Sequence, residues 1–341
     1  MLSVAVIGYG YWGPNLVRNF ASIKEARVAA VCDQRPERLE SVRSLYPAVK
    51  TTTEYAEVLD DAGIDAIVIA TPVSSHYALA SAAFKAGKHV WLEKPMTAGA
   101  EEAVRLIAEA RQARRLLHVD HTFIYTGAVR KIRELVAGGE IGDVYYYDSA
   151  RVNLGLFQHD VNVIWDLAVH DLSIVDHVLG ARPIGVSATG VAHVNGNHAN
   201  IAYLTLFFKN SLIAHFHVNW LAPVKLRQTL IGGSKKMIVW DDLEPSEKVK
   251  VYDKGITLSD DDSVHKARIG YRSGDMWAPR IDATEALRDE AQHFAACVAA
   301  GKPTITDGYA GLRVVEIAEA ATRSLDANGQ MVRLELQKDA E

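Results

Sequence analysis

A glycine-rich loop near the start of the chain places the tightest constraint on the fold. Residues 8–13 read Gly-Tyr-Gly-Tyr-Trp-Gly, between the apolar run Val4–Ile7 and a segment that opens with Pro14. A strand that turns through such a loop into a helix is typical of a dinucleotide-binding βαβ unit, because glycines permit the tight turn and a close approach to pyrophosphate. The helix N-terminus then offers free N–H groups to the phosphates. The residues that we expect to contact a dinucleotide here are Gly8, Gly10, Tyr11, Trp12 and Gly13.

An acidic residue follows the last of these glycines by 20 positions, at the end of the apolar run Arg27–Cys32. A carboxylate at Asp33 can accept the ribose hydroxyls of an adenosine and repels a 2′-phosphate, which favours NAD. Arg35 is the alternative partner for that phosphate, so NADP stays open. A glycine turn that binds nothing is the competing interpretation, and the register of strand, helix and acid argues against it.

The apolar pattern changes character along the chain. Up to about residue 120, short apolar runs alternate with amphipathic segments, as in successive βαβ units. Beyond it, apolar runs such as Tyr145–Val152 and Leu212–Trp220 follow one another with turn signals between them, and a helical pattern returns at Thr284–Ala300. We predict a Rossmann-type α/β domain, residues 1–120, and an α+β domain, residues 121–341, with a large, open, mostly antiparallel sheet.

Composition excludes several classes of protein. The 37 Lys and Arg against 42 Asp and Glu give a net charge of −5, which recommends neither nucleic acid nor an anionic membrane as a partner. The longest apolar stretches, such as Ala66–Ala70, are far shorter than a membrane helix of about 18 residues. No basic secretory leader is evident at the first residues, and Cys32 and Cys297 fit buried core thiols, so we expect a cytoplasmic protein.

Polar residues follow two of the predicted strands of the first domain. Thr71-Pro72 comes after the run Ala66–Ala70, and Glu93-Lys94-Pro95 comes after His89–Leu92. In open α/β sheets ligands bind beyond the carboxyl ends of the strands, so we expect Lys94 to point into the binding crevice. A plain surface lysine is the alternative.

The segment Trp165–Leu179 has two faces at helical spacing. One is apolar, and the other carries Asp166, His170, Ser173 and His177. A carboxylate one turn before an imidazole can hydrogen-bond it and raise its basicity, which suits a general base acting on an alcohol. A solvated polar stripe is the competing interpretation.

The strand that begins at Tyr145 places Tyr147, Ser149 and Arg151 on one face. Arg151 is a candidate anchor for an anionic group such as a diphosphate, and Tyr147 a candidate platform for a sugar, with Tyr125 a weaker one. An ordinary half-buried sheet face is equally consistent with the pattern.

Two further patterns concern metals and partners. His215 and His217 share one face of a strand, but no convincing third and fourth ligand accompanies them among the 13 histidines, so we expect no catalytic metal. The alternation Ala202-Leu204-Leu206-Phe208 suggests burial against a second subunit, and we expect a homodimer or homotetramer.

Taken together, these motifs resemble the Gfo/Idh/MocA family of oxidoreductases, and the resemblance covers most of the chain. It is carried by Gly8–Gly13, Thr71-Pro72 with His76, the run Ala86–Val90 into Glu93-Lys94-Pro95, and Asp166-x-x-x-His170. The stretch Arg151–Asn162 is similar to members that act on UDP- or dTDP-hexoses at C3.

The resemblance implies an NAD(P)-dependent dehydrogenase or ketoreductase that acts on a ring hydroxyl of a hexose. Lys94 matches the lysine that contacts the reacting hydroxyl and the nicotinamide ribose, and Asp166 and His170 match the pair that flanks the substrate, with His170 as acid and base. The remaining residues assigned by resemblance are Thr71, Pro72, His76 and Glu93 at the coenzyme and Asn162 at the substrate.

Two details of this chain qualify the resemblance. Lys94-Pro95 is a candidate cis peptide, because the family often has one there. The chain has Asn162-Val163-Ile164-Trp165 where the family has a glycine-rich approach to the aspartate, which affects the substrate pocket. Since the family includes inositol and free-sugar dehydrogenases and a few members without redox turnover, an inositol, a free sugar and a non-catalytic sensor role are the alternatives.

Overall fold

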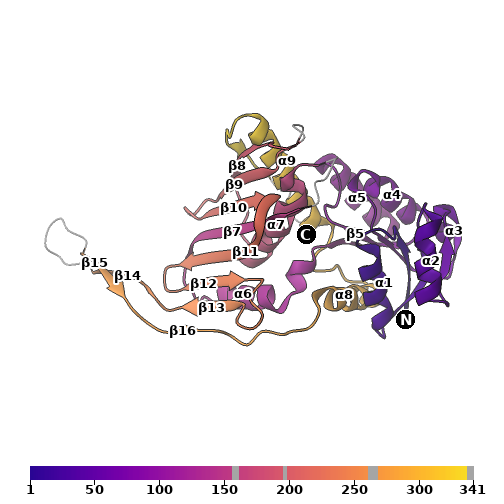
Figure 1. Ribbon diagram of the computed structural model, residues 1–341, viewed down its shortest axis with the longest axis horizontal. Helices are drawn as coiled ribbons and strands as arrows, with labels where there is room; N and C mark the ends of the chain where they lie inside the picture. The colour runs from indigo at the N-terminus through magenta and orange to yellow at the C-terminus, as the bar shows by residue number, and fades with distance from the viewer. Residues whose placement is uncertain (156–160, 195–197, 260–267, 336–341) are drawn as a thin grey trace. The chain divides into compact units, whose positions relative to one another are not determined.

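The computed structural model describes residues 1–155, 161–194, 198–259 and 268–335 (Figure 1). The chain forms two compact units. Unit 1 contains Met1–Tyr125 and Thr284–Glu316; unit 2 contains Thr126–Ala283 and the described part of Ile317–Leu336. The chain therefore returns to its first unit near the end, whereas the predicted division at residue 120 assigned that segment to the second domain.

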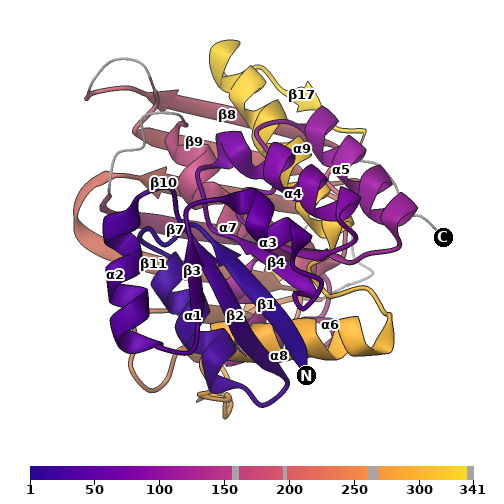
Figure 2. The same ribbon diagram turned by 90° about the vertical axis from the view of Figure 1, so that its right-hand side faces the viewer.

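Unit 1 is built on a six-stranded parallel sheet, whose strands β1 to β3 lie side by side in Figure 2. The strand order is β3-β2-β1-β4-β5-β6, so the winding direction reverses between β1 and β4. In such sheets, ligands bind beyond the carboxyl ends of the strands near this reversal. The strands are β1 (Leu2–Ile7), β2 (Ala26–Cys32), β3 (Lys50–Thr52), β4 (Ala66–Ile69), β5 (His89–Glu93) and β6 (Leu117–Asp120).

Helices connect these strands and bury their apolar faces on the sheet. Helix α1 begins beside Pro14, whose missing N–H costs nothing in the first turn, and buries Leu16, Val17 and Phe20. The helices of unit 1 are α1 (Gly13–Ser22), α2 (Pro36–Leu45), α3 (Tyr55–Asp60), α4 (His76–Lys85), α5 (Ala100–Ala113), α8 (Ala286–Ala300) and the first part of α9 (Gly308–Asp326).

Helix α8 belongs to unit 1 because its side chains complete the core there. Phe294 is fully buried, and its ring meets the edge of Trp91 on β5 at 5.5 Å and that of Phe20 on α1 at 6.4 Å between centroids. Leu287 and Ala291 join the same cluster. Aromatic pairs at these spacings and angles are favourable beyond the area that they bury.

Unit 2 is built on a nine-stranded sheet in the order β16-β13-β12-β11-β7-β10-β9-β8-β17. Neighbours are antiparallel except β10 and β7, which run parallel. The strands are β7 (Val144–Leu154), β8 (Gly185–Val191), β9 (Ile201–Phe207), β10 (Ile213–Asn219), β11 (Leu221–Gly233), β12 (Met237–Asp241), β13 (Val249–Tyr252), β16 (Met276–Trp277) and β17 (Val332–Arg333), with a separate hairpin of β14 (Gly255–Ser259) and β15 (Arg268–Arg272).

Helices cover one face of this sheet. They are α6 (Gly127–Ala137), α7 (Val169–Leu179) and the second part of α9; the backbone N–H of Ala188 on β8 donates to the Ser324 hydroxyl of α9 at 2.8 Å. The covered face of β9 consists of Ala202, Leu204 and Leu206, all fully buried. The alternation that we expected to meet a second subunit is therefore already buried inside its own unit, and the other face carries the exposed Tyr203.

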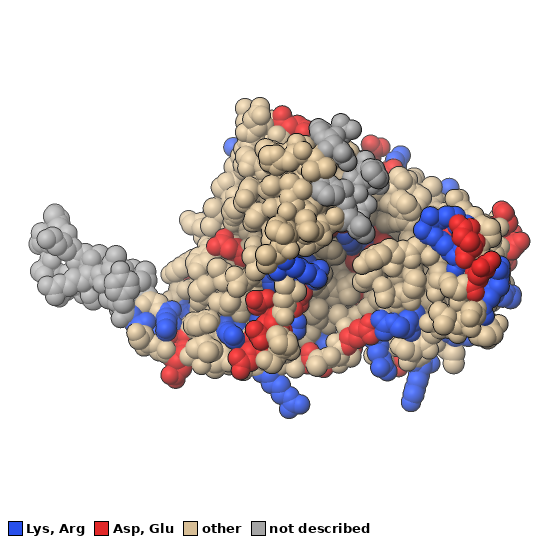
Figure 3. Space-filling model, in the orientation of Figure 1, with Lys and Arg blue, Asp and Glu red and all other residues tan. Residues whose placement is uncertain are grey.

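Three further features of the chain concern its helices, its surface charges and its cysteines. None of the helices in the described ranges combines the length and apolar character that crossing a membrane requires. Basic and acidic side chains lie interspersed on the face shown in Figure 3. Cys32 and Cys297 are buried free thiols.

The place of α8 in unit 1 can be tested by truncating its central aromatic side chain. We expect Phe294→Ala to lower the free energy of unfolding by about 3–5 kcal/mol, because it leaves a cavity against Trp91 and Phe20. Val104→Ala, at a partly exposed position of α5, should cost about 0.5 kcal/mol or less. Urea denaturation measures both; equal effects would show that α8 contributes little to this core.

Candidate functional site

The glycine loop between β1 and α1 has a backbone that only glycine can supply. Gly8 has a φ of +94°, and a Cβ there would lie 2.6 Å from the carbonyl oxygen of Ala70. A Cβ on Gly13 would lie 2.3 Å from the carbonyl oxygen of Gly8. No side chain caps the start of α1 among the described residues, and its first turn has no acidic residue, so its positive end is left for an anion. These features fit a dinucleotide pyrophosphate.

Asp33 lies at the carboxyl end of β2 beside this loop. Its carboxylate accepts the backbone N–H groups of Tyr9 at 2.7 Å and Arg35 at 2.9 Å, and Arg38 lies 3.5 Å away. Burial acts to raise the pKa of Asp33, but these backbone donors and Arg38 outweigh it and hold the pKa below its ordinary value. The carboxylate is thus ionised at neutral pH and fixed in orientation, as acceptance of ribose hydroxyls requires.

His76 joins the two segments that follow β4 and β5. Its ring is buried, with Nδ1 3.0 Å from the carbonyl oxygen of Pro95 and Nε2 2.9 Å from that of Thr71. The Lys94-Pro95 peptide is cis, as the resemblance implies. The structure therefore gives His76 a positioning role between Thr71-Pro72 and Lys94-Pro95, where the sequence suggested a direct contact with the coenzyme.

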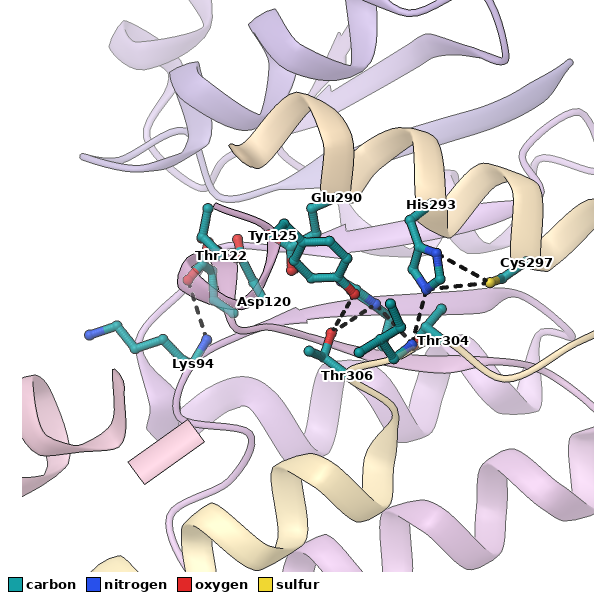
Figure 4. Close-up of polar contacts among 12 residues, drawn as sticks. Lys94, Asp120, Thr122, Tyr125, Glu290, His293, Cys297, Thr304 and Thr306 are labelled. Atoms are coloured by element: carbon teal, nitrogen blue, oxygen red, sulfur yellow. Dashed lines mark hydrogen bonds and ion pairs between the residues drawn. The ribbon is translucent and has the colours of Figure 1, made fainter. Parts of the chain in front are cut away.

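Three carboxyl groups meet behind Lys94, at the carboxyl ends of β5 and β6. The parallel register sets Glu93 opposite Asp120, and Glu290 of α8 lies against Asp120 from the helix layer (Figure 4). Asp120 accepts hydrogen bonds from the Thr122 hydroxyl at 2.5 Å and from the indole N–H of Trp12 at 3.4 Å. A residue of the glycine loop is thereby tied to the end of β6.

Burial controls the protonation of this cluster. It raises the pKa of both Glu93 and Glu290 well above the ordinary value, and the charge of Asp120 raises them further. Burial also lowers the pKa of His118 far below its ordinary value and that of His121 to about 4. Both imidazoles are neutral at pH 7.

A chain of buried polar contacts extends from Glu290. Its Oε1 lies 3.1 Å from Nε2 of His118, whose Nδ1 lies 3.1 Å from the Thr304 hydroxyl. The Tyr125 hydroxyl pairs with that of Thr306 at 3.1 Å in the same network (Figure 4). Tyr125 is thus an internal residue of unit 1, and its expected contact with a sugar is not supported by its burial.

Unit 2 carries the second group of predicted residues. Asp166 lies in a π-helical turn, Ile164–Ala168, that precedes α7, and accepts the indole N–H of Trp220 at 2.9 Å. His170 lies in the first turn of α7 and is partly exposed. Asp166 therefore lies in a π turn, where side-chain spacing differs from that of the regular helix predicted over Trp165–Leu179. Such π turns occur frequently at functional sites.

Three other expected substrate contacts are buried within unit 2. Arg151 forms a bidentate ion pair with Asp171 of α7, at 2.7 and 3.1 Å, and is 3% exposed. Tyr147 is fully buried on the same face, and the side chain of Asn162 accepts the backbone N–H of Ile164 at 3.0 Å. These side chains support the local fold, which corrects their assignment as open anchors. Residues 156–160 of the Arg151–Asn162 stretch lie outside the described residues.

The histidines of the β-sheet do not assemble into a metal centre in the described ranges, where no group of three or more His, Cys, Asp or Glu side chains could hold an ion. His217 instead stacks on the ring of Tyr203, with centroids 4.5 Å apart.

Sequence reasoning missed Asp120, His121 and Glu290. A signal for the first two was present, since the run Leu116–Val119 ends in an acid in the same way that His89–Leu92 ends in Glu93. Glu290 gives no such signal, because its neighbours in the fold are far away in sequence.

With this geometry in place, comparison with known proteins identifies the family. A profile described as "Oxidoreductase family, NAD-binding Rossmann fold" matches residues 2–121, and one described as "Oxidoreductase family, C-terminal alpha/beta domain" matches residues 133–334. The chain therefore belongs to the Gfo/Idh/MocA oxidoreductases. It is an NAD-dependent oxidoreductase with a Rossmann-type domain and an α+β domain, which confirms the predicted fold class, family and coenzyme.

Individual relatives span nearly the whole chain. A UDP-N-acetylglucosamine 3-dehydrogenase of Acidithiobacillus ferrooxidans is 29% identical over 326 residues, covering 93% of this chain and 95% of that protein. A solved structure of that enzyme has a TM-score of 0.83 at 28% identity, covering 96% and 99% of the two chains. A myo-inositol 2-dehydrogenase of Thermotoga maritima is 24% identical over 345 residues, covering 98% and 99%.

The protonated state of Glu290 makes a prediction about stability. The unfolded chain loses this proton near pH 4.5, whereas the folded chain keeps it to higher pH, so wild-type stability falls as pH rises between the two pKa values. Glu290→Gln mimics the protonated acid. The variant should therefore lack this pH-dependent fall in the free energy of unfolding, which amounts to at most about 1.4 kcal/mol per pH unit. Denaturation between pH 4.5 and 8 measures it, with the exposed Glu40→Gln as the control. Parallel pH profiles for wild type and Glu290→Gln would contradict a protonated Glu290.

Proposed function

We propose that the protein oxidises a ring hydroxyl of a hexose with NAD, at C3 of a nucleotide-linked sugar, or runs the reverse reduction. The observation that carries the proposal is the 29% identity, along nearly the full length of both chains, to a UDP-N-acetylglucosamine 3-dehydrogenase. The resemblance of Arg151–Asn162 to sugar-nucleotide enzymes supports the same substrate class. An inositol is the second candidate, favoured by the full-length likeness to a myo-inositol 2-dehydrogenase.

Residues of unit 1 hold the coenzyme in this proposal. The loop Gly8–Gly13 and the first turn of α1 bind the pyrophosphate, and Asp33 accepts the ribose hydroxyls. Thr71-Pro72 and Glu93-Lys94 line the coenzyme site beyond β4 and β5. When bound, NAD supplies the acceptor for the hydride that leaves the sugar carbon.

Acid–base chemistry falls to Lys94, Asp166 and His170. His170 takes the proton of the reacting hydroxyl as its carbon loses hydride, so a ketone, a reduced coenzyme and a protonated imidazole result. Asp166, fixed by the Trp220 indole, stabilises that imidazolium, and Lys94 donates a hydrogen bond to the oxygen as negative charge develops on it. The free thiols Cys32 and Cys297 agree with a reducing cytoplasm, which we include in the proposal.

The substrate class can be tested with purified protein and NAD. We expect the absorbance of reduced nicotinamide to rise with UDP- or dTDP-hexoses, and to rise much less with free hexoses or inositols. The same panel with NADP measures coenzyme choice. Turnover of inositols alone would overturn the sugar-nucleotide proposal, and coenzyme binding without any turnover would favour a sensor.

The proposed role of His170 predicts a loss of turnover without a loss of coenzyme binding. His170→Ala should lower kcat by about 10²–10⁴-fold, because general acid–base help is lost, while the Kd for NAD stays unchanged. His177→Ala is a matched control on the same helix, since His177 pairs with Arg133 at 2.7 Å. Stopped-flow absorbance and coenzyme titration separate the two quantities. A His170→Ala enzyme with nearly full turnover would remove this residue from the mechanism.

We also propose that the uncovered face of the nine-stranded sheet joins copies of the chain into a homodimer or homotetramer. Three large apolar side chains on β9, β10 and β11 are exposed in the single chain, Tyr203, Ile213 and Leu226. Apolar groups exposed on an open sheet face favour association.

Light scattering should give a multiple of the 37.4 kDa chain mass at micromolar concentration. Tyr203→Arg should shift the mass towards the monomer, because it buries a charge in the interface. Tyr145→Arg, at an exposed position of β7 outside this group, should leave the mass unchanged. A monomeric wild type would contradict the proposal.

A further inference from the structure

Glu93, Asp120 and Glu290 form a cluster of carboxyl groups that takes no part in the proposed acid–base chemistry. One oxygen of each glutamate, Oε1 of Glu93 and Oε2 of Glu290, is buried and receives no hydrogen bond from a donor in the described chain. Glu290 is fully buried, and Asp120 is close enough to both glutamates to act on their carboxyl groups. A carboxyl oxygen that faces another carboxyl group is satisfied only when a proton lies between them. Two of the three groups are therefore protonated, and the cluster carries one negative charge.

The donors around the cluster locate this charge on Asp120. The Thr122 hydroxyl and the Trp12 indole both donate to it, whereas Glu93 accepts the weaker backbone N–H of Lys94 at 3.3 Å and Glu290 contacts Nε2 of His118 at 3.1 Å. Protonated Glu93 and Glu290 complete the set of donors. A carboxylate that accepts several hydrogen bonds is the one that stays ionised.

Two cations act on groups of this region, and the other titratable neighbours of the cluster are neutral. The imidazoles of His118 and His121 are neutral, and the Tyr125 phenol is un-ionised because burial raises its pKa. Lys94 is the cation that acts on Glu93, and its side chain extends away from the cluster in Figure 4. Arg313 acts on His121 from α9.

The position of this charge matters for the coenzyme. Trp12 belongs to the glycine loop and Lys94 follows β5, so the cluster touches two of the segments that hold NAD in the proposed function. The nicotinamide ring is a cation when oxidised and neutral when reduced. A fixed, buried anion stabilises the cation and hardly affects the neutral ring.

We propose that Asp120 is a positioning and selectivity residue whose single buried charge, kept single by the protons on Glu93 and Glu290, makes the site prefer oxidised over reduced NAD. This inference rests on the proposed placement of the nicotinamide beside Lys94. In this inference Asp120 supplies the negative charge. Glu93 and Glu290 have a different role, because their protons limit the cluster to a single negative charge.

The test is the ratio of the Kd values of NAD⁺ and NADH, measured by calorimetry for wild type and for Asp120→Asn, Glu290→Gln and Trp12→Phe. Asp120→Asn removes the charge and should shift the ratio about tenfold towards NADH, an effect expected for a unit charge at roughly 10 Å in a protein interior. Glu290→Gln mimics the protonated acid and should leave the ratio within about twofold. Trp12→Phe keeps the charge but loses the indole donor, and should weaken both forms alike.

Two results would overturn the inference. One is a folded Asp120→Asn protein with the wild-type ratio; the other is a shift in Glu290→Gln as large as that of Asp120→Asn, which would mean that Glu290 is ionised. A protein that shows the expected shift but oxidises no sugar would contradict the proposed function and leave this inference standing.

A second measurement does not depend on the folding of Asp120→Asn. Infrared spectroscopy of wild type at neutral pH should show the C=O stretch of protonated carboxyl groups, and Glu290→Gln should remove part of that signal. Absence of the band in wild type would contradict the single-charge cluster.

Discussion

The parallel register of β5 and β6 sets the conditions for the rest of the site. It places Glu93 directly opposite Asp120 at the carboxyl edge of the sheet, where α8 adds Glu290. Three carboxyl groups in one buried volume cannot all be ionised, because the cost of burying each charge adds to their mutual repulsion. The fold therefore favours the protonated forms of Glu93 and Glu290. Lys94 directly follows Glu93 in the chain and donates its backbone N–H to the Glu93 carboxyl group. Trp12 of the glycine loop donates its indole N–H to Asp120.

The two units supply different parts of the proposed chemistry. Unit 1 provides a rigid coenzyme platform, with the glycine turn, Asp33 and the loop pair connected by His76. Unit 2 provides the π turn that carries Asp166 and the helix that carries His170. The buried Arg151–Asp171 pair anchors that helix to the sheet, so the expected substrate anchor is an element of the scaffold.

Short sequence motifs were sufficient to predict the glycine loop and its surroundings in unit 1. The glycine loop, the proline at the start of α1, and Asp33 at the end of β2 are features of short segments. Features that depend on distant contacts were not predictable in this way. Glu290 meets Asp120 only after α8 packs on the sheet, and Arg151 meets Asp171 only after α7 covers β7. The π turn was hidden because the apolar spacing of Ala168 and Leu172 is the same in a regular helix.

The most direct test of the account follows a single hydrogen atom. UDP-N-acetylglucosamine carrying deuterium at C3 is incubated with the protein and NAD, and the reduced coenzyme is analysed by mass spectrometry. The account predicts that the reduced nicotinamide gains the deuterium, and that sugar labelled at C2 or C4 transfers none. Deuterium retained on the C3-labelled sugar while coenzyme is reduced, or transferred from another ring position, would contradict oxidation at C3.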